Sequence, residues 1–339
     1  MTSRSIIGQL AAAILGQDRA DYALSVLEIA PALLADGPRA SRAQVAMALN
    51  LVLFARLLDD VPTAARHVAG VAARGERLCF DHGALRTIDG PTGALPAGHA
   101  AFARLLEPLG YEVAGLYPLP RLRMTGRAYA HRDLPEAVPQ FFVSELHVAD
   151  LPEDAQAAAA RIFGTSRDPI GKTEQALLDA LAAAPTSDAA CDLDLARAGL
   201  PGLARAFGRQ HDTPALADYE TLRDHSAEGA WIATEGNAFN HATDRVPDVA
   251  ALAERLRTDS WPIKDRLEIS ANARVRQTAF RADMVTRRFR LADGRTAERT
   301  VPGSFYEFIS RDIDPATGRL DLTFDSGNAT GIFAMTRVG

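Results

Sequence analysis

Apolar residues recur at helical spacing in two long stretches of the chain, residues 3–76 and 152–227. In the first stretch the breaker Gly37-Pro38 interrupts the pattern, and Ser41 is placed to cap a second long helix. Prolines interrupt the second stretch, which is rich in alanine and leucine. Both stretches are therefore predicted to consist of helices joined by turns.

The rest of the chain has patterns that are typical of strands. Residues 78–149 and 236–335 each open with an extended run, continue with a helix at 96–109 or 248–258, and then give several strands. Turn signals such as Asp293-Gly294 separate these strands. The chain is thus predicted to contain one strand–helix–strands unit twice. The predicted strands are residues 78–80, 85–88, 111–117, 121–129, 140–148, 237–246, 266–269, 275–289 and 304–311.

Composition narrows the class of protein and its partners. The 339 residues include 37 basic and 43 acidic side chains, for a formal net charge of −6, and 47% are hydrophobic. This fits a packed globular protein and argues against nucleic acid as the main partner, because phosphate binding requires a basic face. The most apolar stretch, residues 45–58, is too short to span a membrane. Cys79 and Cys191 cannot form a disulfide framework, so we expect a cytoplasmic protein.

The opening strands of the two units share a tripeptide form, Phe80-Asp81-His82 and Phe239-Asn240-His241. Both tripeptides stand at the same point of their unit, ahead of its helix, so a duplicated fold can bring the two histidines together. Two neutral imidazoles and one carboxylate, with positions left open, form the ligand set of a catalytic non-haem Fe(II). The same ligands with one open position suit a hydrolytic or isomerising zinc, so these residues do not determine which metal binds.

Glu307 is the carboxylate that we expect to join the two histidines. Strand alternation places it on one face with Phe305 and Ile309, so it either faces solvent at a sheet edge or is buried and paired. Burial of an unpaired carboxylate is costly, which makes a metal a natural partner. A salt bridge with a nearby arginine is the alternative.

Arg86 is a candidate substrate-binding residue. It lies four positions after His82, so on an extended strand the two share a face about 13 Å apart. Its guanidinium can bind the far carboxylate of a substrate held at a metal, in a bidentate geometry that lysine lacks. The alternative is an ordinary surface arginine. His147, on a predicted strand, is an alternative metal ligand, and three further histidines are expected to be solvated: His67, His99 and His225.

Residues 82–87 (HGALRT), 239–243 (FNHAT) and 301–308 (VPGSFYEF) stand out as motifs within the two units. Together they resemble the 2-oxoadipate dioxygenase/decarboxylase family, also called hydroxyglutarate synthase, which is related to the vicinal oxygen chelate superfamily. Residues 276–278 and 328–336 also resemble family segments. The resemblance covers most of both units and is less distinctive in the helical stretches.

The resemblance implies an α+β fold in which two βαβββ units form a cupped, barrel-like sheet with added N-terminal and inter-unit helices. On this interpretation the chain has an N-terminal helical segment (1–76), a first unit (77–150), a helical insertion (151–230) and a second unit (231–339). The second unit then carries two of the three metal ligands.

The family binds one Fe(II) through two histidines and a glutamate, which fall here on His82, His241 and Glu307, the expected catalytic centre. Its substrate-binding arginine falls on Arg86, and Gln277 is a second expected substrate contact. The implied reaction converts 2-oxoadipate and O2 into 2-hydroxyglutarate and CO2. The implied partners are this small 2-oxo acid and O2, with neither nucleic acid nor a membrane, and a homodimer is compatible with the duplicated unit.

Other functions stay open from the sequence. One is a glyoxalase-type isomerase or lyase that uses zinc or nickel, and another is a non-catalytic small-molecule binding protein. A dioxygenase acting on a different 2-oxo acid is a further alternative. Longer family members have an additional C-terminal segment that helps to line the substrate pocket, so the length of the accepted carbon chain is also open.

Overall fold

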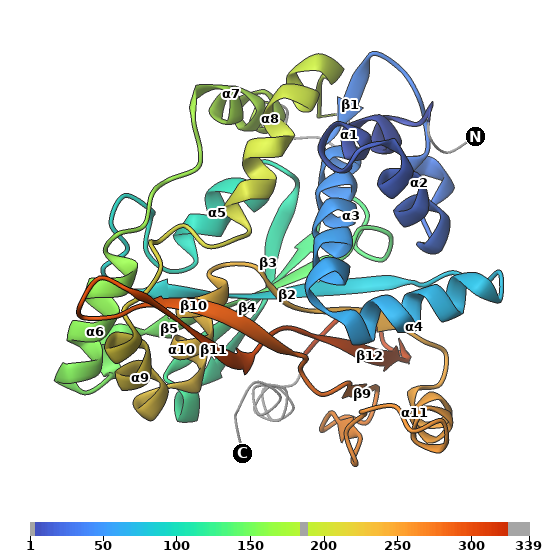
Figure 1. Ribbon diagram of the computed structural model, residues 1–339. Helices are drawn as coiled ribbons and strands as arrows, with labels where there is room; N and C mark the ends of the chain where they lie inside the picture. Colours follow the sequence, from blue (N-terminus) through green and yellow to red (C-terminus); the bar gives the residue numbers. More distant parts are fainter. Residues whose placement is uncertain (1–3, 184–188, 325–339) are drawn as a thin grey trace.

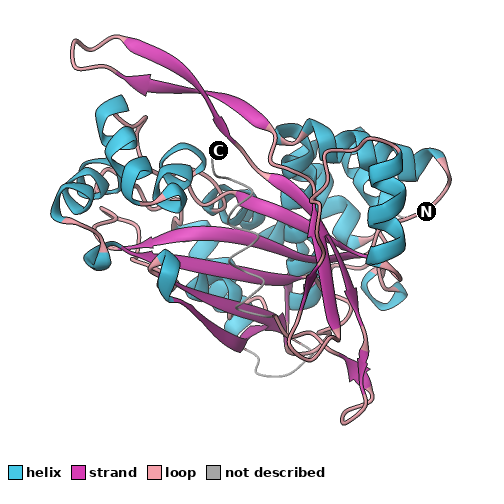
Figure 2. Cartoon of the chain, turned by 90° about the horizontal axis from the view of Figure 1, so that it is seen from below, coloured by secondary structure: helices cyan, strands magenta, loops and turns pink. Residues whose placement is uncertain are grey.

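The computed structural model describes residues 4–183 and 189–324, and at its centre this part of the chain forms a curled sheet of eight strands (Figure 1). The strand order is β3-β4-β5-β2-β7-β12-β9-β8. Figure 2 shows this sheet curling between two groups of helices. The strands are β2 (Phe80–Asp89), β3 (Tyr111–Leu119), β4 (Met124–His131), β5 (Gln140–His147), β7 (Phe239–Arg245), β8 (Glu268–Ile269), β9 (Val275–Ala279) and β12 (Phe305–Arg311).

The sheet contains the predicted unit twice, around β2 and β7, which lie antiparallel at its centre. β2 pairs in parallel with β5, the last strand of the first unit, and β7 pairs in parallel with β12, the last strand of the second. A helix follows each opening strand, α5 (Ala100–Leu106) after β2 and α11 (Val249–Thr258) after β7. The predicted α+β fold with two strand–helix–strands units in a cupped sheet is therefore confirmed.

A large hydrophobic core joins the sheet to the helices of both helical stretches. Its central helix begins after Ser41, as predicted, with a capping box in which the hydroxyl of Ser41 accepts from the backbone N–H of Gln44. The helices of this group are α1 (Ile6–Leu15), α2 (Gln17–Val26), α3 (Arg42–Asp60), α4 (Pro62–Ala73), α7 (Lys172–Ala182) and α8 (Leu193–Ala206). The second group is α6 (Glu153–Phe163), α9 (Leu216–His225) and α10 (Ala227–Glu235).

The packing of β12 on the helices determines which way Glu307 points. The rings of Tyr306 and Phe308 lie 6.4 Å from Phe54 of α3 and 5.0 Å from His67 of α4, respectively. Because successive side chains of a strand point to opposite faces, Glu307 is directed away from these helices and into the hollow of the sheet.

The run 275–289, predicted as one strand, is two strands in different sheets. Its second part is β10 (Met284–Arg290), which forms a hairpin with β11 (Thr296–Pro302) around Asp293-Gly294 and extends away from the body (Figure 2). Most β10 side chains are exposed, so its hydrophobic pattern does not specify pairing with the central sheet. Phe289 is the anchor, with its ring 4.6 Å from that of Tyr219 in α9.

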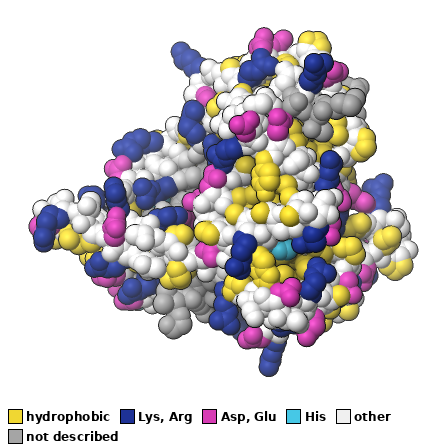
Figure 3. Space-filling model, turned by 45° about the vertical axis from the view of Figure 1, so that its right-hand side comes forward, with side chains coloured by type: hydrophobic (Ala, Val, Ile, Leu, Met, Phe, Trp, Pro, Cys, Tyr) yellow, Lys and Arg dark blue, Asp and Glu magenta, His cyan; other side chains and the backbone are white. Residues whose placement is uncertain are grey.

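Short elements complete the described chain. Two small antiparallel pairs are β1 (Arg39–Ser41) with β6 (Ala190–Asp192), and β13 (Ile313–Asp314) with β14 (Arg319–Leu320). Single turns of 3-10 helix lie at Pro31–Leu33, Pro120–Leu122 and Val148–Asp150. Among the described helices, none has both the length and the apolarity needed to cross a bilayer. On the face shown in Figure 3, basic and acidic side chains are interspersed around hydrophobic ones.

Candidate metal centre

Three predicted ligands meet on adjacent strands in the hollow of the sheet. His82 on β2 and Glu307 on β12 are both register partners of Thr243, which lies on the intervening strand β7 together with His241. One nitrogen of each histidine and one carboxylate oxygen of Glu307 all lie within 4.8 Å of one another, and all three residues are buried. The antiparallel β2–β7 pair and the parallel β7–β12 pair therefore converge on one point.

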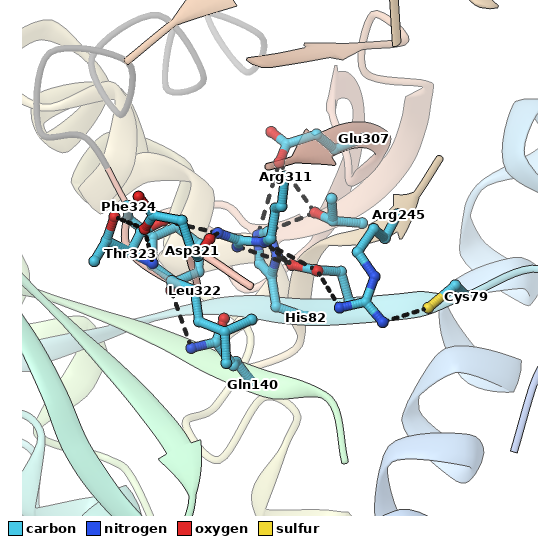
Figure 4. A network of polar contacts seen from close by, with 12 residues as sticks. Cys79, His82, Gln140, Arg245, Glu307, Arg311, Asp321, Leu322, Thr323 and Phe324 are labelled. Carbon is cyan, nitrogen blue, oxygen red and sulfur yellow. Dashed lines mark hydrogen bonds and ion pairs between the residues drawn. The ribbon is translucent and has the colours of Figure 1, made fainter. Parts of the chain in front are cut away.

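Each histidine is oriented by the residue that precedes it. The Nδ1 of His82 lies 2.9 Å from an oxygen of Asp81, and the Nδ1 of His241 lies 3.1 Å from the Oδ1 of Asn240 (Figure 4 shows His82 and its surroundings). When Nδ1–H donates to these oxygens, the lone pair of each imidazole is on Nε2 and is available to a metal. The repeated tripeptide thus supplies both a predicted ligand and its orienting partner in each unit, a relationship that the sequence interpretation missed.

Burial disfavours charge on all three groups, and a cation held between them would offset this cost for the carboxylate. Burial lowers the pKa of both His82 and His241, which favours the neutral imidazoles that coordinate metals. Burial also raises the pKa of Glu307 to about 8. Its Oε1 accepts a hydrogen bond from the Thr243 hydroxyl at 3.1 Å, whereas its Oε2 is buried and has no hydrogen-bond partner among residues 4–183 and 189–324. A divalent metal would supply the missing partner, so this donor set fits a metal ion.

Among the described residues, no arginine forms the alternative salt bridge with Glu307. Arg311, four residues later on β12, binds Asp81 instead, with its Nη2 2.9 Å from Oδ1 of that carboxylate. Although burial alone would raise the pKa of Asp81, Arg311 and His82 hold it below its ordinary value. Asp81 is therefore an ionised acceptor for the Nδ1–H of His82.

Arg86 is buried rather than on the surface, with 1% of its area exposed. Its guanidinium lies 5.0 Å from the ring centre of Trp231 on α10. Burial lowers the pKa of Arg86 to about 10, against the opposing effect of the Glu228 carboxylate. Such a buried guanidinium is suited to a carboxylate ligand.

Gln277 lies one strand away from Glu307, on β9. Its register partner on β12 is Ile309, so it is on the same face of the sheet as Glu307. Its amide donates to Glu268 at 3.1 Å, and it does not belong to the ligand cluster. Its role in substrate binding stays a prediction. The predicted family segment 328–336 lies outside the described residues.

The other histidines lie elsewhere in the fold. His147 contacts Asp89 at 2.8 Å on the far end of the first unit and is not part of the ligand cluster. The prediction that His67 is solvated is wrong: it is 7% exposed, and burial lowers its pKa to about 4. Helical spacing alone did not show that this face of α4 packs on β12. His99 and His225 keep partly exposed side chains.

The model of the family described as "2-oxoadipate dioxygenase/decarboxylase" matches residues 45–320. The chain belongs to this family. A 2-oxoadipate dioxygenase/decarboxylase of Arabidopsis thaliana, described as chloroplastic, is 22% identical over 291 residues, which are 77% of this chain and 69% of that protein. The resemblance seen in the sequence motifs is thereby confirmed.

Solved structures support the same fold for this member of the 2-oxoadipate dioxygenase/decarboxylase family. A protein from Ralstonia eutropha JMP134, described as belonging to the glyoxalase superfamily, is 50% identical with a TM-score of 0.89, covering 94% of this chain and 98% of that one. Hydroxyglutarate synthase from Oryza sativa, solved in complex with 2-oxoadipate, is 20% identical with a TM-score of 0.66, covering 87% and 93%. The vicinal oxygen chelate-like fold is therefore shared.

Proposed function

We propose that the protein is an Fe(II)-dependent dioxygenase that decarboxylates a 2-oxo dicarboxylic acid, with 2-oxoadipate and O2 giving 2-hydroxyglutarate and CO2. The observation that carries the proposal is the buried cluster of two imidazoles and the Glu307 carboxylate, one oxygen of which has no hydrogen-bond partner within the described part of the chain. This ligand set is typical of non-haem Fe(II) oxygenases. Membership of the family supports the reaction, and the rice relative was solved with 2-oxoadipate bound.

His82, His241 and Glu307 would hold the iron, which when bound supplies the redox chemistry that O2 requires. The chain's own contribution begins with the orientation of these side chains. Asp81 and Asn240 hold the two imidazole rings through Nδ1, and the Thr243 hydroxyl holds one oxygen of Glu307. This preorganisation leaves the donor atoms directed at one point before any substrate arrives.

The residues between the centre and Arg86 would bind and orient the substrate. Ala84 lies between His82 and Arg86 on the same face of β2. It packs in an apolar cluster with Ala128 and Phe142, which would exclude water from the carbon chain of the substrate. Arg86 would bind the far carboxylate and so select a dicarboxylic acid of matching length.

Oxygen consumption tests the proposed reaction. The metal-free protein is loaded anaerobically with Fe(II), mixed with 2-oxoadipate, and followed for O2 uptake and CO2 release. We expect matched uptake and release with Fe(II), none with Zn(II), and none after His82→Ala, His241→Ala or Glu307→Ala. His147→Ala is the matched control, because this histidine lies outside the cluster, and it should retain activity.

The same assay distinguishes the alternatives. O2 uptake with another 2-oxo acid, but not with 2-oxoadipate, would change the substrate and leave the dioxygenase class in place. Metal binding without O2 uptake for any 2-oxo acid would contradict the proposal and favour a glyoxalase-type isomerase or lyase. We also propose a cytoplasmic enzyme, in keeping with the two free cysteines, Cys79 and Cys191.

A further inference from the structure

We propose that Arg311 is a positioning residue that couples the orientation of the His82 imidazole to the docking of the segment Asp321–Phe324 beside the metal centre. This inference rests on the proposed metal centre, and it concerns residues that do not themselves bind the metal. Arg311 comes from the end of β12, the strand that also carries Glu307.

One side of the Arg311 guanidinium holds Asp81, the residue that contacts the Nδ1 of His82. Its Nε lies 3.1 and 3.0 Å from the two oxygens of Asp81, and its Nη2 lies 2.9 Å from Oδ1. That same Oδ1 lies 2.9 Å from the Nδ1 of His82. The side chains of Arg311 and Asp81 are 0% and 2% exposed, so the pair is shielded from water. Arg245 is a second cation near Asp81, at the longer distance of 3.8 Å.

The other side of the guanidinium binds the backbone near the end of the described chain. The Nη1 of Arg311 donates to the carbonyl oxygen of Asp321 at 2.9 Å and to that of Thr323 at 2.8 Å (Figure 4). Because a guanidinium is a planar and rigid fork, its two sides cannot move independently. Displacement of the segment would therefore disturb the hydrogen bonds that hold Asp81, and through them the ring of His82.

The segment also touches the centre directly. The ring of Phe324 stands edge-on to the imidazole of His82, with 4.8 Å between ring centres, and lies 4.8 Å from the ring of Phe142. The backbone N–H of Phe324 donates to the hydroxyl of Tyr117 at 3.0 Å. In this position the Phe324 ring packs against His82, one of the proposed metal ligands.

The start of the segment has an anchor of its own, which supports the assignment. Asp321 accepts from the Nε of Arg274 at 2.6 Å, which fixes the point where the segment begins.

In the second unit the residue before the histidine is the neutral Asn240, and none of the ion pairs among the described residues involves it. Within the described chain, the histidine of the first unit, unlike that of the second, is therefore connected through a charged pair to a distant segment.

The coupling predicts that metal binding and segment docking stabilise each other, because a coupling free energy between two sites acts in both directions. In the wild-type full-length protein, titration with Co(II) should slow amide hydrogen exchange in residues 321–324. In Arg311→Lys the planar fork is lost. We expect Co(II) affinity to fall by ~10- to 100-fold, the range typical of residues that orient metal ligands. Exchange in residues 321–324 should be faster, and Co(II) should no longer slow it.

Arg276→Lys is the matched control. Arg276 also lies next to β12 and pairs with an aspartate, Asp312, through two nitrogens, but it contacts neither Asp81 nor the segment. It should leave both Co(II) affinity and exchange unchanged. Asp81→Asn is a second test variant, because it keeps an acceptor for His82 and removes the charge that binds Arg311. It should speed exchange in the segment and lower Co(II) affinity less than Asp81→Ala does.

Two results would overturn the inference. One is a Co(II) affinity in Arg311→Lys within twofold of wild type, and the other is a lower affinity with unchanged exchange in residues 321–324. Circular dichroism and thermal unfolding establish that each variant is folded, and if Arg311→Lys does not fold, the Asp81→Asn result decides. Failure of the wild type to bind Co(II) would instead refute the metal centre itself, which is a separate outcome.

Discussion

The Thr243 hydroxyl donates a hydrogen bond to the Oε1 of Glu307 at 3.1 Å, across the parallel pair of strands β7 and β12. The same hydroxyl lies 3.1 Å from the Nε2 of His82. Since Thr243 has one hydroxyl proton, donating it to the carboxylate leaves the His82 lone pair uncommitted. One side chain from the middle strand therefore holds the glutamate close to the histidine.

Removal of this hydroxyl should weaken metal binding without unfolding the protein. We expect Thr243→Val to reduce Co(II) affinity by ~10-fold, the lower end of the effect of residues that orient ligands, because the Glu307 carboxylate loses its fixed position. Calorimetric titration with Co(II) measures this. Thr278→Val is the control, since Thr278 lies on β9 and its buried hydroxyl has no hydrogen-bond partner among the described residues. Equal affinities in both variants would contradict the role of Thr243.

The stability of the metal-free protein should depend on Glu307 between pH 6.5 and 8. Burial raises the pKa of this carboxyl from 4.5 to about 8, so the folded state binds its proton more tightly than the unfolded chain does. Its contribution to stability is complete below pH 4.5 and is lost as the pH rises through 8. Between pH 4.5 and 8 the free energy of unfolding falls by about 1.4 kcal/mol per pH unit.

Glu307→Gln should remove this dependence. Urea unfolding of the metal-free proteins at pH 6.5 and 8 should show a steeper decline of the free energy of unfolding in the wild type than in the variant. Buried histidines with a lowered pKa also affect stability around pH 6.5, where the unfolded imidazoles release their protons. Both proteins contain the same histidines, so the comparison with the variant isolates Glu307. Parallel pH profiles would show that Glu307 ionises normally in the folded protein.

Arg86 should determine selectivity for dicarboxylic acids and not metal binding. We expect Arg86→Ala to retain Co(II) affinity and to raise the KM for 2-oxoadipate ~10- to 100-fold, as expected for the loss of a hydrogen bond to a charged group. Steady-state O2 uptake measures KM. The control substrate is 2-oxohexanoate, which lacks the second carboxylate and should be little affected. An equal loss for both substrates would remove Arg86 from carboxylate recognition.

The close approach of Gly83 to Phe239 should make this glycine irreplaceable. A Cβ on Gly83 would lie 2.2 Å from the ring of Phe239, so the strand that carries His82 or its neighbour would have to shift. We expect Gly83→Ala to lower the free energy of unfolding by ~1–3 kcal/mol, as overpacking usually does. Gly70→Ala is the control, because its nearest atom, on Arg74, is 3.7 Å away. It should stabilise helix α4 by ~0.5–1 kcal/mol. Unchanged stability of Gly83→Ala in urea unfolding would mean that the ring can move aside.

The features that could be predicted from the sequence depend on local patterns. Alternation along β12 placed Glu307 between two apolar side chains, and the repeated tripeptide placed His82 and His241 at equivalent points of two units. Ser41 predicted the start of α3 through its cap. Strand alternation, caps and turns involve residues a few positions apart, so they can be recognised in the sequence alone.

The features that could not be predicted depend on contacts between distant residues. Arg311 and Asp81 are 230 positions apart, and nothing near either residue indicates the other. His67 has an ordinary helical spacing, and only the packing of α4 on β12 buries it. The division of 275–289 into two strands depends on which partner each part finds, and this partner choice is a property of the closed sheet.

The donor types, the duplicated unit and the family could be inferred from the sequence alone, because they depend on residue identity and short-range periodicity. The tertiary structure decided that the donors meet within 4.8 Å. It also decided that no described residue offers a hydrogen-bond partner to the second oxygen of Glu307 and that Arg86 is buried. Burial and pairing arise only when β2, β7 and β12 become neighbours, which brings Thr243 next to His82, 161 positions away, and next to Glu307, 64 positions away.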